Sequence, residues 1–155
     1  MIGMITVRKY EIYLIDESLA KQYIGKEKLF FSLFKEYHHA KGDKAQILGR
    51  QVLYITNKIP DQILQKNLQA DSNKSIQFKD GVYYIHLKEN NNGILKGRAE
   101  MTIHQRTVQI VAEGSYDAET LFFEIIRKCK SSFLAVDIEN IKYGWLRPIK
   151  ERKLI

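Results

Sequence analysis

Apolar residues alternate with other residues near the start of the chain, in the period of a β-strand. The apolar positions that carry the alternation are Tyr10, Ile12 and Leu14. We therefore expect a strand over residues 7–15. Asp16 follows as a competent helix cap and Gly25 as a left-handed stop, which predicts a short helix over residues 17–24.

This short helix carries two apolar rows. Leu19 with Tyr23, and Ala20 with Ile24, are each four residues apart and so share a helix face. A short helix on a sheet needs only one row in the core. The other row is either covered by neighbouring elements or faces solvent as an apolar, aromatic patch of the kind that binds a partner. The spacing leaves both possibilities open.

Helical spacing continues over residues 27–39. Its apolar stripe consists of Leu29, Phe30, Leu33, Phe34 and Tyr37. Phe31 falls outside the stripe, next to its edge, and is a second candidate for an exposed aromatic. Strand-forming residues then predict a strand over residues 51–56. Pro60 marks the start of another helix, with Ile63, Leu64 and Leu68 on one face.

The second half of the chain predicts mainly strands. Asp80-Gly81 joins two strand-forming runs and predicts a hairpin. Two further strands are expected at 98–104 and 107–113, and the polar stretches at 71–74 and 90–93 are expected to be loops. A helix should begin near Ser115 or Asp117, both competent caps. Its buried stripe is formed by Ala118, Leu121, Phe122, Ile125, Ile126 and Cys129. A strand over 133–138 follows.

This order of elements predicts an α/β (α+β mixed) fold. Residues 1–155 are expected to form a single-domain sandwich, with a mixed, mostly antiparallel central sheet and helices on both faces. Hydrophobic residues make up 45% of the chain and charged residues 28%. That balance is ordinary for a globular protein, so the core needs no disulfide or metal.

Charge and cysteine content bear on the cellular compartment and on the kind of partner. A single cysteine and the absence of a signal-peptide or membrane-spanning pattern favour a cytoplasmic protein. The net charge of +7 favours an acidic partner, such as nucleic acid, a membrane surface or an acidic protein. The basic residues are scattered, however, which favours a solvated basic face.

Candidate chemistry is sparse. The four histidines lack the spacing of metal ligands. Asp117 and Glu119 are better explained as residues of a helix start, Glu124 as a solvated residue and Cys129 as a core residue. No nucleotide-binding or nucleophile motif is present. We therefore expect no enzymatic activity, metal, cofactor or small-molecule substrate.

Two closing segments, residues 114–124 and 143–152, are the most distinctive of the chain. The second holds the only tryptophan, Trp145, which either anchors a recognition tail or, as we favour, packs on the core. With motifs elsewhere, these segments resemble the SirA family, the sporulation inhibitor of replication proteins. The resemblance is densest at Gly114, Tyr116, Asp117, Ala118, Glu119, Phe122, Phe123, Tyr143, Gly144, Trp145, Leu146 and Pro148.

The resemblance implies an α/β sandwich and a regulator of replication. Members of this family bind the N-terminal domain of the replication initiator DnaA and stop new rounds of replication as sporulation begins. Their binding face implies a site here at Leu19, Tyr23 and Gln51, with Gln51 at the start of the second strand. Leu19 departs from the family pattern, in which an aromatic residue is expected. A basic nucleic-acid-binding regulator and an enzyme using Asp117 or a histidine are the alternatives.

Overall fold

One antiparallel sheet organises the molecule. The computed structural model describes residues 7–70, 75–89 and 94–149, so the loops expected at 71–74 and 90–93 and the residues after 149 lie outside it. Within these residues the strands are β1 (Arg8–Ile15), β2 (Thr56–Asn57), β3 (Ile76–Lys79), β4 (Val82–Glu89), β5 (Ile94–Ile103), β6 (Thr107–Gly114), β7 (Phe133–Asp137) and β8 (Lys142–Trp145). Their order is β3-β4-β5-β6-β1-β7-β8, with β2 paired to β1.

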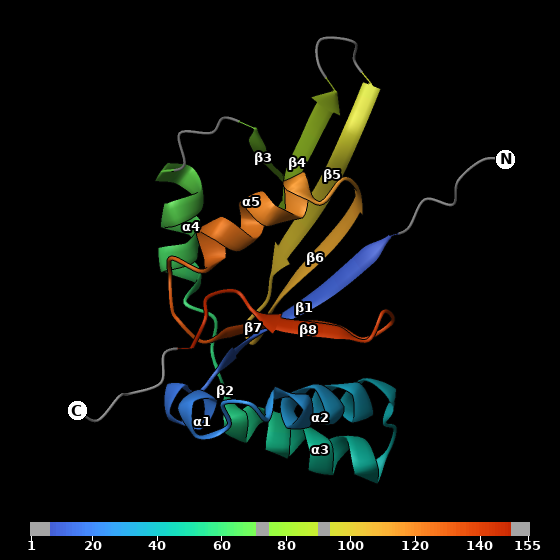
Figure 1. Cartoon of the computed structure of the whole chain (residues 1–155), viewed down its shortest axis with the longest axis vertical. Coiled ribbons are helices and arrows are strands. Elements are labelled where there is room, and N and C mark those ends of the chain that lie inside the picture. Colours follow the sequence, from blue (N-terminus) through green and yellow to red (C-terminus); the bar gives the residue numbers. More distant parts are fainter. Residues whose placement is uncertain (1–6, 71–74, 90–93, 150–155) are drawn as a thin grey trace, which may run out of the picture.

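Helices cover both faces of this sheet, as expected. Within the described residues they are α1 (Glu17–Gln22), α2 (Glu27–His39), α3 (Asp43–Ile55), α4 (Asp61–Ala70) and α5 (Asp117–Ile126). Figure 1 shows α1, α2 and α3 together beside β1, β7 and β8, and α4 and α5 as a separate group. Each described strand pairing is antiparallel.

Strand β1 supplies side chains to two hydrophobic cores. Ile12 and Leu14 belong to the core under α4 and α5, whereas Tyr13 and Ile15 belong to the core under α1, α2 and α3. Alternate residues of a strand point to opposite faces, so one strand can serve both cores. Strand β7 does the same, and all five of its residues are buried.

The predicted hairpin is confirmed at β3 and β4. Lys79 pairs with Val82, and the two residues between them have positive φ angles, 53° at Asp80 and 81° at Gly81. Two successive positive φ angles define the type I′ turn that suits the twist of paired strands.

The strand expected at residues 51–56 is wrong. That segment is the end of α3, and only Thr56–Asn57 is a strand. Leu48 and Val52, four residues apart, are both buried, so tertiary packing of a helical face overrides strand propensity here.

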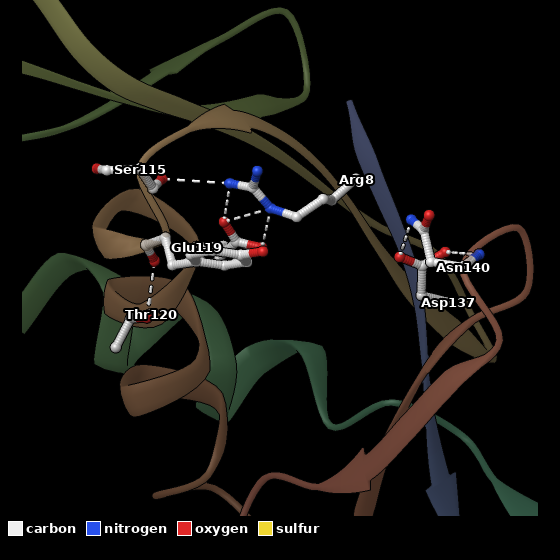
Figure 2. A network of polar contacts seen from close by, with 7 residues as sticks. Arg8, Ser115, Glu119, Thr120, Asp137 and Asn140 are labelled. Carbon is white, nitrogen blue, oxygen red and sulfur yellow. Dashed lines mark hydrogen bonds and ion pairs between the residues drawn. The ribbon is translucent and has the colours of Figure 1, made fainter. Parts of the chain in front are cut away.

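The closing segments differ from expectation in detail. The cap residue of α5 is Tyr116, whose side chain makes no capping hydrogen bond, so neither Ser115 nor Asp117 caps the helix. Helix α5 ends at Ile126, which leaves Cys129 half-buried in the following turn. Strand β8 was not expected; it is reached through a turn in which Asn140 donates from its side chain to Asp137 over 2.7 Å (Figure 2).

Glu119 is a buried ion-pair residue and not merely part of a helix start. It is 1% exposed and faces Arg8, which is 6% exposed. The Arg8 Nε donates to both carboxylate oxygens over 3.0 Å, and Nη2 donates to the carbonyl oxygen of Ser115 over 3.2 Å (Figure 2). The Tyr116 ring stacks on the guanidinium at 4.2 Å. This network ties α5 to the first strand.

We predict that Glu119→Gln lowers the free energy of unfolding by about 3 kcal/mol, because it leaves the Arg8 charge buried without its counter-ion. Urea denaturation measures the loss. The matched control is Glu124→Gln on the same helix, whose pair with Arg127 is exposed and should cost less than about 1 kcal/mol. Equal losses in the two variants would contradict the prediction. The double variant Arg8→Met/Glu119→Leu should recover most of the stability.

Candidate partner-binding site

A hollow of about 550 Å³ is lined by residues of the three-helix layer. Its lining side chains come from α1, α2, α3 and the cap residue after α1. Figure 1 shows these three helices lying together. The lining residues are Leu19 of α1, its C-cap residue Tyr23, Leu29, Phe30 and Leu33 of α2, and Arg50, Gln51, Tyr54 and Ile55 of α3. Most of this surface is apolar or aromatic, so water at the hollow is held weakly and a partner can displace it.

Helix α1 presents its two apolar rows differently. The Asp16 side chain accepts a hydrogen bond from the Leu19 N–H over 3.1 Å, which confirms the predicted cap. Ala20 is fully buried and fixes the inward face. Leu19 and Tyr23 therefore lie at the side of the helix, half-buried, and line the hollow.

The start of α1 is joined to the end of α3. Ile15 pairs with Thr56, and the Asp16 N–H donates to the carbonyl oxygen of Ile55 over 2.8 Å. Gln51 lies about one helical turn before Ile55 on α3, so this junction brings Gln51 to the side of α1. Leu19, Tyr23 and Gln51 thus line one hollow, although Gln51 lies on a helix and not at the start of a strand.

Aromatic packing supports the floor of the hollow. The Tyr23 and Phe30 ring centroids are 5.4 Å apart, and Phe30 in turn meets Trp145 edge-on at 6.2 Å. Phe30 is 5% exposed and anchors this row in the core. Trp145 is half-buried against the same core, which agrees with the packing role that we favoured.

Two exposed residues of the hollow with large apolar or aromatic side chains were missed by sequence analysis. Tyr54 is 81% exposed and Leu29 is 56% exposed. Leu29 was expected in the buried stripe of α2, but the helix is turned so that Phe31 is buried instead, stacked on Tyr143 at 5.0 Å. Helical spacing over 43–55 would have placed Gln51 and Tyr54 on one face.

Titratable groups elsewhere are engaged in structural contacts. Asp117 pairs with Lys96 at 2.7 Å, and this cation lowers the pKa of the carboxyl group. Burial raises the pKa of the Cys129 thiol, which lies 3.2 Å from the Asn67 side chain, so the thiol is less readily ionised than a free cysteine.

The described residues contain no group of three or more His, Cys, Asp or Glu that could hold a metal ion. Among the described helices, none has the length and apolar character needed to cross a membrane.

This hollow is largely apolar and aromatic, and Arg50 is the one charged residue among its described lining residues. A concave surface of this kind is typical of a protein-binding site. The family model of the sporulation inhibitor of replication protein SirA matches residues 8–150, and the chain belongs to this family. A relative from Bacillus subtilis (strain 168), named sporulation inhibitor of replication protein SirA, is 38% identical over 151 residues, covering 96% of this chain and 99% of the relative.

Glu27 links the start of α2 to Trp145 beside the hollow, and the strength of this link depends on pH. Its carboxylate accepts hydrogen bonds from the Gly25 N–H over 3.1 Å and from the Trp145 indole over 3.2 Å. Partial burial alone would raise the pKa of Glu27. Hydrogen bonds from the backbone and from the indole outweigh burial and hold this pKa below its ordinary value of 4.5.

We predict that Glu27→Gln lowers the melting temperature at pH 7 and that this difference shrinks as the pH falls below about 4.5. The sign follows because the pKa is lower in the folded state, so the ionised carboxylate stabilises the fold only above its unfolded pKa. Thermal unfolding monitored by circular dichroism from pH 3 to pH 7 tests this. Glu36→Gln on the exposed face of α2 is the control. A difference independent of pH would contradict the assignment.

Proposed function

We propose that this protein inhibits the initiation of chromosome replication during sporulation by binding the N-terminal domain of DnaA at the hollow. Family membership and the name of the Bacillus subtilis relative support the inhibitory role. The observation that carries the site is that Leu19, Tyr23 and Gln51 line the same hollow, although all of α2 separates Tyr23 from Gln51 in the sequence.

In this proposal Leu19 and Tyr23 are the apolar anchors. Both are half-buried, so part of each side chain stays available to a partner while the rest is held by the core. Tyr23 is also supported by Phe30 beneath it. A pre-positioned aromatic loses little conformational entropy on binding, which favours tight association. Leu29 and Tyr54 line the same hollow and extend its apolar surface.

Gln51 fixes the register of the complex. Its side chain is exposed at a hollow lined mainly by apolar and aromatic residues, and it offers both donors and an acceptor. A polar group at this position gives specificity, because a partner that leaves it unpaired after water is excluded pays a desolvation cost. The exposed Lys26 beside α1 contributes positive charge near the same surface.

Inhibition then follows from occupancy and requires no chemistry. A bound copy of this protein covers a surface that DnaA needs, either for its own assembly or for another partner. The protein acts stoichiometrically in the cytoplasm, without catalytic activity, cofactor or small-molecule substrate.

We predict that Tyr23→Ala weakens binding to the DnaA N-terminal domain by about 2 kcal/mol or more, as removal of an interface anchor does. Isothermal titration calorimetry measures the affinity. Tyr84→Ala is the matched control, because Tyr84 is also half-buried but lies on β4, away from the three helices. An unchanged affinity for a correctly folded Tyr23→Ala would refute the site, and no binding by the wild-type protein would refute the proposed partner.

A further inference from the structure

A second hollow, of about 540 Å³, borders the opposite side of α1. It lies where α1 meets the turn after α5 and the chain after β8, three segments that Figure 1 shows converging near the end of the described chain. Its lining residues are Glu17, Lys21, Arg127, Ser131, Arg147, Pro148 and Ile149. The hollow is therefore built from segments that are distant in sequence and held together by the fold.

Positive charge predominates in this hollow. Lys21 is partly offset by Glu17 at 3.4 Å, and Arg127 by Glu124 at 3.2 Å. Arg147 is half-buried and makes no ion pair or hydrogen bond with the residues that the structure describes. A guanidinium offers five donors in a planar fork that matches a carboxylate. Arg147 is thus a cation whose donors remain available to an incoming anion.

Helix geometry places the two hollows on either side of one helix. Successive residues of a helix are about 100° apart. With Ala20 buried, the row of Leu19 and Tyr23 lies to one side of the inward face, and the row of Glu17 and Lys21 lies to the other. The first row lines the apolar hollow and the second row lines the basic one. A partner that covers α1 meets both.

We propose that the basic hollow receives carboxylate side chains from an acidic segment of the protein that docks on the apolar hollow. This inference rests on the proposed function, since it assigns a second contact to the same partner. Charge complementarity favours an acidic segment as the occupant. The hollow has an excess of cations, one of them unpaired within the described structure, and it lies beside the apolar hollow. The net charge of +7 also attracts an acidic partner at long range.

The two hollows then have different physical roles. Side chains at the basic hollow are half-buried or exposed, so charge attraction there mainly accelerates encounter and fixes orientation. The apolar hollow excludes water and slows dissociation. The geometry therefore separates association, governed by Lys21, Arg127 and Arg147, from retention, governed by Leu19 and Tyr23.

The test compares binding kinetics to the DnaA N-terminal domain at several salt concentrations by surface plasmon resonance. We expect Arg127→Ala/Arg147→Ala to slow association about fivefold at low ionic strength and to flatten its salt dependence, with a smaller change in dissociation. The control Lys66→Ala/Lys79→Ala removes the same charge from exposed positions on α4 and β3. Arg147→Glu alone should slow association further than Arg147→Ala.

The outcomes separate this inference from the proposed function. If the wild-type protein does not bind, the proposed function fails. If it binds and Tyr23→Ala speeds dissociation, but the arginine variants behave like the lysine control, only the basic hollow is refuted. Binding of a DNA duplex by the wild-type protein that is lost in the arginine double variant would assign the hollow to nucleic acid and overturn the proposal.

Discussion

The structure depends on a first strand whose second half, residues 12–15, is buried on both faces. Strand β1 pairs with β6 on one side and with β7 on the other, and β2 pairs with its end. Its alternate residues enter two separate cores, so a polar substitution at Tyr13 or Ile15 affects the three-helix layer, whereas one at Ile12 affects α4 and α5. The Arg8–Glu119 pair adds a polar link at the start of the same strand. Because β1 continues directly into α1, the proposed binding surface is positioned by this central strand.

The fold could be predicted from the sequence wherever the signal is local. The Asp80-Gly81 turn, the cap at Asp16 and the alternation along β1 each depend on neighbouring residues, and all are confirmed. Helix α3 could not be predicted in this way, because its strand-forming residues become helical through packing against distant segments. The burial of Glu119 could not be predicted from the sequence either, since its counter-ion Arg8 lies at the other end of the chain.

The candidate site shows the same division. The spacing of Leu19 and Tyr23 on one helix face indicated a second apolar row, but spacing alone left open whether that row was covered. The place of Gln51 came from the family resemblance, and its position beside α1 depends on the hydrogen bond between Asp16 and Ile55. Tyr54 was missed because a residue assigned to a strand could not be placed on the outer face of a helix.

The position of the only tryptophan has an optical consequence. Trp145 lies two rings from Tyr23, with Phe30 between them, and its indole N–H donates to Glu27 at the start of α2. Indole emission responds to the polarity and hydrogen bonding around the ring. This chain therefore carries an intrinsic fluorophore beside its apolar hollow, and occupancy of that hollow can be followed in the unlabelled protein.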